Sequence, residues 1–158
     1  MAIDINEICT KYGDRLYAVA FNICRQPQDA EDIVQEAFLR LYRSDKDFES
    51  EEHLKAWLIR VTINTAKSLY TSFWHKNRVS YEEYMENIAF EDPCDRELME
   101  VVMSLPQKYR IIVHLYYYEG YKTREIADIL NLSENTVKTR LVQSRRILKT
   151  ELEGWEDE

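Results

Sequence analysis

The sequence predicts an all-α protein made of two small helical domains joined by an acidic linker, the second domain containing a helix-turn-helix. Three glycines and three prolines among 158 residues leave few positions for the tight turns of a β-sheet. Apolar residues recur at steps of three and four along most of the chain, which is the period of an α-helix. Residues 120–149 follow the pattern of a short amphipathic helix, a polar turn and a longer second helix. These three observations define the fold class.

Three helices are predicted in the first half of the chain. The first spans residues 5–24, and its apolar face consists of Ile5, Ile8, Tyr12, Leu16, Ala20 and Ile23. The pair Gln26-Pro27 ends it, and the second helix begins at about Asp29. The apolar positions of the second helix are Ala30, Ile33, Val34, Ala37, Phe38 and Leu41. The third helix covers residues 52–74, with an inward face of Leu54, Trp57, Leu58, Val61, Thr65 and Leu69.

Charge is segregated into blocks, although the whole chain carries a net charge of -8. Residues 26–52 contain nine acids and three bases, whereas residues 53–81 contain five bases and no acid. Residues 82–100 contain eight acids and one base, and residues 133–150 contain five bases and one acid. The overall acidity therefore conceals two basic surfaces, which favour contact with nucleic acid.

The first basic block carries Arg60, Asn64 and Lys67 on one side of the third helix. The aromatic residues interleaved with its bases are Tyr70, Phe73, Trp74 and Tyr81. Cations can contact phosphates and aromatic rings can stack on unpaired bases, so this mixture suits nucleic acid. Packing in a hydrophobic core is the alternative role for these aromatics. It is the favoured role for Trp57 and, by a smaller margin, for Tyr70, Phe73 and Trp74.

A linker is predicted at residues 78–96, where acids dominate, helical periodicity fades and Pro93 interrupts the chain. Two more helices follow at residues 97–104 and 107–118. The apolar residues expected to pack beneath the helix-turn-helix are Leu98, Val101, Val102, Ile111, Ile112 and Leu115. The tyrosine run 116–118 is predicted to be helix core and rim, and His114 to be a packed or surface residue.

The helix-turn-helix is predicted to have its first helix at residues 123–130, its turn at 131–134 and its second helix from Asn135 onward. The inner face of the first helix consists of Ile126, Ala127 and Leu130. Ser133 is a suitable N-cap for the second helix, with Glu134 favourable in its first turn. On a helical wheel the second helix buries Val137, Leu141, Ser144 and Leu148 and exposes Asn135, Thr139, Val142, Gln143 and Arg146. The exposed face is therefore a candidate DNA-contacting surface.

No residues in the sequence predict a catalytic site, a metal site or a cofactor. Cys9, Cys24 and Cys94 are odd in number and lack CxxC spacing, so neither a disulfide framework nor a zinc site is indicated. The histidines form no ligand spacing with them, and no phosphate loop, GxSxG or HExxH motif occurs. No apolar run reaches the length of a membrane span, and residues 1–25 lack the pattern of a signal peptide. A cytoplasmic location is expected.

Four sequence blocks together resemble the bacterial RNA polymerase sigma factors of the extracytoplasmic-function type. The blocks are AEDIVQEAFLRLY at 30–42, WLIRVTINTAK at 57–67, LPQKYRIIVHLYYYEGYKTREIADIL at 105–130 and SENTVKTRLVQSRRIL at 133–148. The second pair alone is weakly specific, because many regulators share such a helix-turn-helix. All four blocks in this order, across an acidic linker, are strongly specific for the family.

The resemblance implies a promoter-specificity subunit whose partners are core RNA polymerase and promoter DNA, both as duplex and as melted strand. Its implied parts are a region 2 domain at residues 1–77, a linker at 78–96 and a region 4 domain at 97–153. The residues that resemble the polymerase-docking surface are Asp29, Asp32, Gln35, Glu36 and Leu39. The residues that resemble contacts to the minus-ten element are Ser50, Glu51, Glu52, His53 and Leu54, in a loop that captures a flipped base, and Arg60, Asn64 and Lys67, which face the adjoining duplex. The residues that resemble contacts to the minus-thirty-five element are Lys138, Thr139, Val142 and Gln143 at base edges, and Thr123, Arg124, Arg140, Arg145 and Arg146 at phosphates.

Two departures from the family pattern concern promoter recognition. The stretch 44–52 is unusually acidic and offers only Phe48 as an aromatic, so strand capture there cannot rely on a row of stacked rings. Position 143 is Gln where an Arg would be natural, which favours contact with adenine over guanine. The additional regions of larger sigma factors are missing, which implies by analogy that any autoinhibition comes from a separate anti-sigma protein.

Two other functions are compatible with parts of the sequence. A stand-alone regulator would bind an operator through the helix-turn-helix without polymerase, and would use the N-terminal helices to dimerise or to sense a signal. A hydrolase or metal enzyme with an incidental basic face would need titratable residues clustered in a pocket. The sequence supplies no candidate set for such an enzyme.

Overall fold

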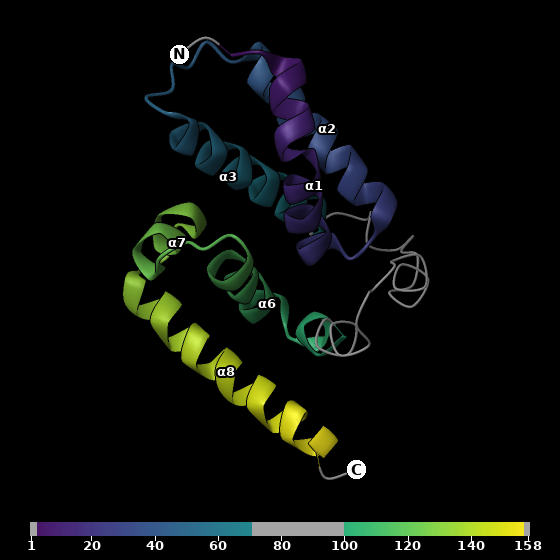
Figure 1. The fold of residues 1–158 in the computed structure, drawn as a ribbon, viewed down its shortest axis with the longest axis vertical. Helices are drawn as coiled ribbons and strands as arrows, with labels where there is room; N and C mark the ends of the chain where they lie inside the picture. The colour runs from purple at the N-terminus through teal and green to yellow at the C-terminus, as the bar shows by residue number, and fades with distance from the viewer. Residues whose placement is uncertain (1–2, 71–99, 157–158) are drawn as a thin grey trace. The chain divides into compact units, whose positions relative to one another are not determined.

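The computed structural model describes residues 3–70 and 100–156 (Figure 1). Every regular element in these two ranges is a helix, which confirms the predicted fold class. The chain divides into two compact units, residues 1–85 and 86–158. Each unit has its own core. The predicted linker and the aromatics Tyr81, Trp74 and Phe73 lie outside the described residues.

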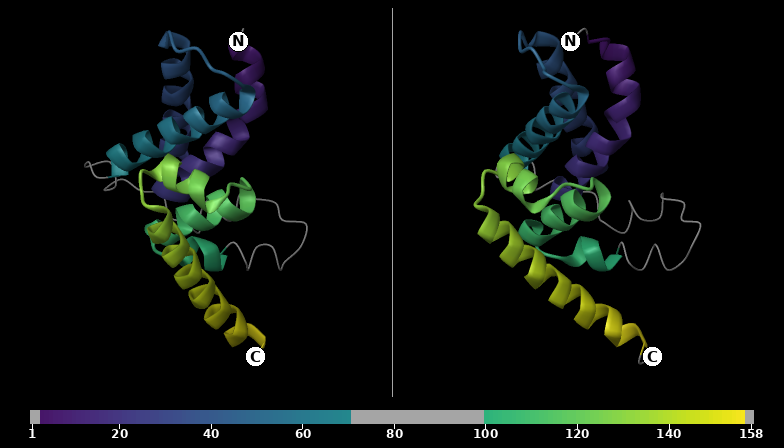
Figure 2. Two further views of the ribbon diagram at one scale, coloured as in Figure 1. Left: turned by 90° about the vertical axis from the view of Figure 1, so that its left-hand side faces the viewer. Right: turned by 60° about the vertical axis from the view of Figure 1, so that its left-hand side comes forward.

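The first unit is built from α1 (Ile5–Cys24), α2 (Pro27–Arg43) and α3 (Glu51–Tyr70). Each of these helices contacts the other two, and α3 runs across the pair formed by α1 and α2 (Figures 1 and 2). Their apolar faces meet in a core whose largest fully buried side chains are Leu16, Phe21, Ile23, Ile33, Leu54, Leu58, Ile59 and Ile63.

The junction between α1 and α2 is tighter than the sequence suggests. Helix α1 ends at Cys24, and Arg25 takes the left-handed conformation with φ 55°, while its N–H bonds to the carbonyl of Phe21 at 2.9 Å. Gln26 caps the next helix, because its Oε1 accepts from the backbone N–H of Gln28 at 3.2 Å. Helix α2 thus begins at Pro27, two residues before the predicted start. Proline suits the first helical position, where its fixed φ is favourable and no N–H is needed.

The buried face of α3 differs from the predicted one. Leu54, Leu58 and Thr65 are buried as expected, but Trp57, Val61 and Leu69 are only half-buried. The buried positions that the wheel missed are Lys55, Ile59, Thr62, Ile63 and Ala66. Because α3 packs against both α1 and α2, its buried face is wider than a single stripe and is centred elsewhere. The predicted end of this helix at Trp74 lies outside the described residues.

The second unit contains a helical segment at 100–104, α6 (Gln107–Val113), the π-helix η2 (His114–Tyr118), α7 (Thr123–Leu130) and α8 (Glu134–Glu156). The predicted core residues that are indeed buried are Val101, Val102, Ile111, Ile112, Leu115, Ile126, Ala127 and Leu130. Leu98 lies outside the described residues. A cluster of Val102, Leu105 and Val113 packs against the partly buried Tyr109, Ile147 and Leu148, and the last two of these residues belong to α8.

The stretch 107–118 was expected to be one regular helix, but its last five residues form the π-helix η2. The N–H of Glu119 bonds to the carbonyl of His114 at 3.2 Å, which is the five-residue spacing of a π-turn. The wider turn keeps His114 and Leu115 buried, while Tyr117 and Tyr118 are 54% and 64% exposed. Tyr116 is half-buried, so the prediction that part of this tyrosine run is core is wrong.

Arg110 ties the start of the second unit together. Its side chain is buried, and Nη1 donates to the carbonyl of Leu105 at 3.0 Å and to that of Met103 at 3.4 Å. A buried guanidinium needs such acceptors, since an unpaired buried charge is costly. Arg110 therefore fixes the segment at 100–104 against α6.

Candidate nucleic-acid interface

The turn of the helix-turn-helix is shaped by two residues. Asn131 ends α7 in the left-handed conformation with φ 55°, and the N–H of Leu132 then bonds to the carbonyl of Ala127 at 2.9 Å. Ser133 caps α8, because its Oγ accepts from the backbone N–H of Thr136 at 3.1 Å. The predicted cap is therefore confirmed, and α8 begins at Glu134, one residue before the prediction.

Helix α8 separates a buried face from an exposed one, as the wheel predicted. Val137, Leu141 and Ser144 are buried, and Leu148 is half-buried. The exposed side chains of the outer face are Asn135, Thr139, Val142, Gln143 and Arg146. Val142 is 44% exposed, although valine is most often a buried residue, and it suits apolar contact with a thymine methyl group.

The carboxylate of Glu134 links α7 to the start of α8. The hydroxyl of Thr123 in α7 donates to Oε1 of Glu134 at 3.1 Å. The ammonium group of Lys138 lies 3.5 Å from the same oxygen. Thr123 was predicted to contact phosphate, and its hydroxyl is instead engaged inside the motif. Lys138 is exposed and placed one turn into α8.

Two tyrosine contacts on α8 were missed by the sequence analysis. The hydroxyl of Tyr109 donates to Oε1 of Gln143 at 2.9 Å. On another side of the helix, Nε of Arg145 donates to the hydroxyl of Tyr117 at 2.8 Å, and its guanidinium lies 5.5 Å from the ring centre of Tyr116. The hydrogen bond to Tyr117 raises the pKa of Arg145 further. Both side chains are therefore held before any DNA is bound.

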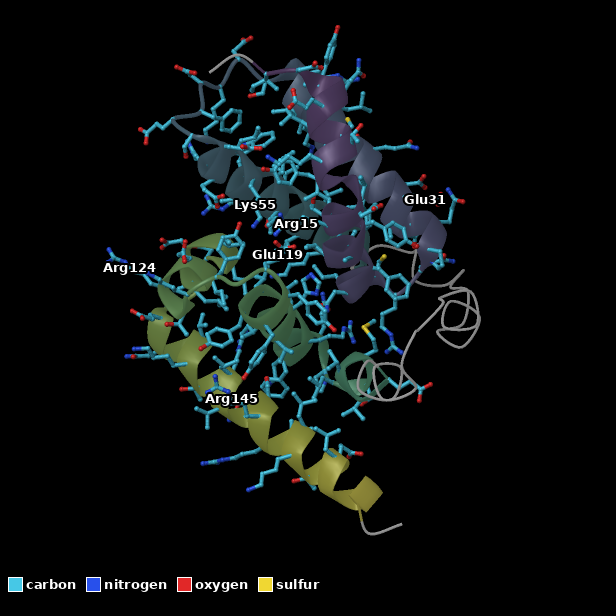
Figure 3. The ribbon with its side chains drawn as sticks, viewed as in Figure 1. Arg15, Glu31, Lys55, Glu119, Arg124 and Arg145 are labelled. Carbon is cyan, nitrogen blue, oxygen red and sulfur yellow. The ribbon has the colours of Figure 1, made fainter. Side chains whose placement is uncertain are left out.

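Three other predicted phosphate contacts differ in their surroundings. Arg124 is exposed, and in Figure 3 its side chain extends away from α7. Arg146 is exposed on the outer face of α8, whereas Arg140 is half-buried at its edge. Arg145 lies alongside α8 in the same view (Figure 3). The second unit thus presents cations around an exposed helix face, as a DNA-contacting motif requires.

The stripe on α3 is exposed along its whole length. Arg60, Asn64 and Lys67 are all accessible, in agreement with the wheel. The side chain of Tyr70 and the aromatics after it are outside the described side chains, so their contacts stay predictions. Among the bases of the first basic block that the structure describes, Arg60 and Lys67 are exposed and Lys55 is buried.

The loop before α3 is more ordered by internal contacts than its composition suggests. Oγ of Ser50 accepts from the N–H of His53 at 3.1 Å, and Nδ1 of His53 accepts from the N–H of Glu49 at 3.2 Å. Phe48 is buried and packs edge-on against His53 and Trp57. The ring of Phe48 therefore packs inside the first unit and is not exposed for stacking on a DNA base.

The segment 50–54 was predicted to be a loop, but from Glu51 onward it forms the first turn of α3, and two of its residues have structural partners. Leu54 is fully buried in the core. The carboxylate of Glu51 forms an ion pair with Lys11 and accepts a hydrogen bond from the hydroxyl of Tyr12 at 2.9 Å. The bond from Lys11 and then that from Tyr12 hold the pKa of Glu51 below its usual value. Glu52 is exposed, as are the side chains of Ser50 and Glu51.

The predicted docking residues of α2 divide between two hollows, each of about 550 Å³. The polar hollow lies between α2 and α3 and is lined by Asp29, Asp32, Glu36, Arg40, Asn64, Thr65, Ser68 and Leu69. The apolar hollow lies between α1 and α2 and is lined by Ile5, Cys9, Gln35, Phe38, Leu39 and Tyr42. Leu39 is 44% exposed and Tyr42 is 73% exposed at the rim of the second hollow. Helix α2 is therefore a ridge with a polar groove on one side and an apolar groove on the other.

The carboxylates of the polar hollow are partly engaged along α2. Asp32 accepts from Nε2 of Gln28 at 3.2 Å, and Glu36 accepts from Nε of Arg40 at 3.1 Å. Asn64, which was predicted to face DNA, lines this hollow together with the docking residues. Oγ1 of Thr65 is buried there with no hydrogen-bond partner. The hollow thus offers carboxylate and amide acceptors to an incoming donor.

His114 is buried, and its ring stacks on that of Tyr118 at 5.2 Å. Burial lowers the pKa of His114 to about 4, against a smaller opposing effect of Glu119. The described residues contain no group of three His, Cys, Asp or Glu side chains that could hold a metal ion. None of the helices in the described ranges is both long and apolar enough to cross a membrane.

The fold and these surfaces define an all-helical DNA-binding protein with a helix-turn-helix in its second unit. Residues 8–75 match the family model described as Sigma-70 region 2, and residues 95–148 match that described as Sigma-70, region 4. The RNA polymerase sigma factor SigV of Bacillus subtilis (strain 168) is 32% identical over 146 residues, covering 90% of this chain and 87% of SigV. The ECF RNA polymerase sigma factor SigW of the same organism is 27% identical, covering 92% of this chain and 87% of SigW.

Solved structures share the fold. The sigma factor RpoE from Bartonella quintana, in complex with the anti-sigma factor NepR, matches with a TM-score of 0.72 at 19% identity, over 94% of this chain and 96% of that chain. CnrH, in complex with the cytosolic domain of CnrY, matches with a TM-score of 0.69 at 21% identity, over 95% of this chain and 88% of that chain. The chain belongs to the sigma-70 family and is an RNA polymerase sigma factor of the extracytoplasmic-function type, a transcription initiation factor. The match to region 2 favours this function over a stand-alone regulator.

Proposed function

We propose that the first unit docks this sigma factor on core RNA polymerase, that both units contact the promoter, and that the first unit helps to open the duplex. The observation that carries the proposal is the exposed outer face of α8 opposite the buried Val137, Leu141 and Ser144. The factor supplies specificity and no catalytic group, because RNA synthesis belongs to the polymerase. It acts in the cytoplasm, where polymerase and chromosome are found.

The second unit, residues 97–153, contacts the minus-thirty-five element in this proposal. Lys138, Thr139, Val142 and Gln143 face base edges in the major groove, where an α-helix fits and each base pair has its own pattern of donors and acceptors. The phosphate contacts are made by Thr123, Arg124, Arg140, Arg145 and Arg146. Of these, Arg124, Arg145 and Arg146 are exposed, and the hydroxyl of Thr123 also donates to Glu134.

The first unit, residues 1–77, contacts the minus-ten element. Arg60, Asn64 and Lys67 face the duplex and its phosphates along one side of α3. The segment from Ser50 to Leu54 captures an unpaired base through its exposed polar side chains and backbone. Because Leu54 is buried, its part is to hold the first turn of α3 in place rather than to touch the base. Residues 78–96 connect the two domains.

The α2 ridge docks on polymerase. Asp29, Asp32 and Glu36 line a hollow rich in acceptors, which suits lysine or arginine side chains of the partner. Gln35 and Leu39 border the apolar hollow, which suits aliphatic or aromatic side chains. The two grooves on either side of α2 would then be filled by one partner surface that presents both kinds of group.

A separate anti-sigma protein is a further proposed partner. Two sigma factors of similar fold were solved in complex with an anti-sigma factor and with the cytosolic domain of CnrY, respectively. Affinity purification of the tagged chain from its native cell, with polymerase subunits and any further protein identified by mass spectrometry, would test both partners together.

Run-off transcription tests the central proposal. Purified chain is mixed with bacterial core enzyme and a library of genomic fragments, and transcripts are sequenced. We expect promoter-dependent transcripts that share two upstream elements and that are absent with core enzyme alone. The proposal fails if a folded preparation, checked by circular dichroism, yields no such transcript. Tight binding to duplex DNA without polymerase would also contradict it.

A further inference from the structure

We propose that Tyr109 is a promoter-specificity residue, because its hydroxyl orients the Gln143 amide that faces a base edge. The inference rests on the proposed function and adds to it a residue outside the helix-turn-helix. Neither the motif pattern nor the helical wheel assigns any role in base recognition to α6.

The geometry joins a rigid ring to a flexible amide. Oη of Tyr109 donates to Oε1 of Gln143 at 2.9 Å. The Tyr109 ring packs against the buried cluster of Val102, Leu105 and Val113, so the hydroxyl is held by the core of the unit. Gln143 is exposed on α8 and would otherwise exchange among several rotamers. Anchoring it lowers the conformational entropy that DNA binding must remove.

The bond also sets which part of the amide meets DNA. With the tyrosine hydroxyl on Oε1, the amide orientation is fixed and Nε2 remains available to donate. Donors recognise the acceptor positions of the major groove, which are N7 of the purines, O6 of guanine and O4 of thymine. Cytosine presents only a donor there. The anchored Gln143 therefore favours a base with an acceptor edge, guanine as well as adenine, and disfavours cytosine at one position. This replaces the preference for adenine over guanine expected from the sequence.

Tyrosines on η2 provide a matched case with a different expected effect. The hydroxyl of Tyr117 accepts from Nε of Arg145 at 2.8 Å, and the guanidinium lies 5.9 Å from the Tyr117 ring centre. Arg145 is a phosphate-contacting residue in the proposed function, and phosphates carry no sequence information directly. Loss of the Tyr117 hydroxyl should therefore weaken binding without changing base preference.

The test uses the full chain with core polymerase and a promoter selected by the wild-type holoenzyme from a randomised library. Every position of the minus-thirty-five element is then varied through all four base pairs, and open-complex formation is measured. We expect Tyr109→Phe to lower discrimination at one position by about two- to tenfold, the value of one hydrogen bond. Gln143→Ala should lose discrimination at the same position. In the Gln143→Ala background, Tyr109→Phe should have no further effect.

The controls separate specificity from folding and from general affinity. Tyr117→Phe should weaken binding by a similar factor on every sequence, and Tyr118→Phe, whose ring stacks on His114, should change neither property. Urea denaturation checks that each variant is folded. Unchanged discrimination in Tyr109→Phe, or an equal effect with and without Gln143, overturns the inference. Failure of the wild type to select any promoter would instead overturn the proposed function.

Discussion

Thr65 and Thr62 in α3 both carry buried hydroxyl groups, but only one of the two is hydrogen-bonded. Oγ1 of Thr65 is buried at the polar hollow without a hydrogen-bond partner, whereas Thr62, one turn earlier on α3, donates to the carbonyl of Leu58 at 2.8 Å. A buried polar group without a partner costs free energy that an apolar group of the same shape does not. The same substitution at the two positions should therefore have opposite effects.

We expect Thr65→Val to raise the free energy of unfolding by about 1 kcal/mol, since it removes an unsatisfied hydroxyl. Thr62→Val, the matched control, should lower it by about 0.5 to 1 kcal/mol, since it removes a hydroxyl that is hydrogen-bonded. Urea denaturation followed by circular dichroism measures both. Equal losses of stability in the two variants would show that the Thr65 hydroxyl is satisfied in solution.

Arg146 is the clearest candidate for a phosphate contact, because it is exposed on the outer face of α8. Arg146→Ala should weaken holoenzyme binding by a similar factor on all promoter sequences and reduce the slope of log affinity against log salt by about 1. Binding titrations at several salt concentrations measure the slope. Thr150→Ala, one turn further along the exposed side of α8, is the control and should leave the slope unchanged. A change of base preference in Arg146→Ala would contradict the assignment.

The sequence predicts which side chains are buried or exposed where the helical period alone determines this. The exposed and buried positions of α8 follow the wheel because a single face packs against the unit. The tyrosine contacts of Gln143 and Arg145 could not be predicted, because they depend on how α6 and η2 cross α8. Likewise, the wheel gave no sign that the Glu51 carboxylate is held by α1. Contacts between elements are set by packing and not by spacing along the chain.

At the scale of an element, η2 carries a pH-sensitive histidine in its first position. Burial lowers the pKa of His114 from its ordinary value of 6.5 to about 4. Between these values the unfolded chain binds a proton that the folded chain does not, so unfolding becomes easier as pH falls. Above pH 6.5 the residue is neutral in both states and contributes no pH dependence.

We expect His114 to make the second unit less stable by about 3 kcal/mol between pH 6.5 and pH 4. His114→Gln has no proton to gain, so it should lose less stability over this window, whatever its stability at neutral pH. Thermal and urea denaturation across pH 4 to 7.5, analysed as the difference between the two proteins, isolates the effect. His53→Gln, at a half-buried position of the first unit, is the control. Parallel pH profiles for wild type and His114→Gln would refute the prediction.

The presence of each helix was easier to predict than its exact start or its geometry. Helices α1, α7 and α8 follow the expected ranges within one residue at their described starts, because caps and apolar period agree there. The early start of α2 at Pro27 and the π-turns of η2 escaped the sequence analysis. A proline can end one helix or open the next, and a π-turn leaves no distinctive residue pattern. The wide buried face of α3 depends on its two neighbours, which periodicity within α3 does not reveal.

At the scale of the whole molecule, the acidic ridge of α2 should govern assembly with polymerase. Asp32→Lys should weaken binding to core enzyme by about tenfold or more. It would place a cation opposite the lysine or arginine side chains that polymerase presents to the polar hollow in the proposed function. Glu36→Lys should act in the same direction. Fluorescence anisotropy of a labelled chain with core enzyme measures the affinity.

Glu31→Lys provides the matched control for this prediction. It makes the same charge change on the same exposed helix, but Glu31 lines neither hollow. It should retain most of the affinity, because an exposed charge outside the contact surface contributes little. Equal loss in all three variants would mean that overall charge, and not the polar hollow, attracts polymerase. Circular dichroism should show that each variant keeps its helical content.

The division into two units, each with its own buried core, makes the chain a bivalent ligand. Once one unit is bound to the polymerase–promoter assembly, the other binds at an effective concentration set by the chain that connects them. Each contact can then be individually weak while the pair is strong. A promoter with one poor element would be used less, not ignored, and substitutions on α8 could shift promoter choice without disturbing how α2 meets polymerase. Graded promoter strength would thus come from avidity.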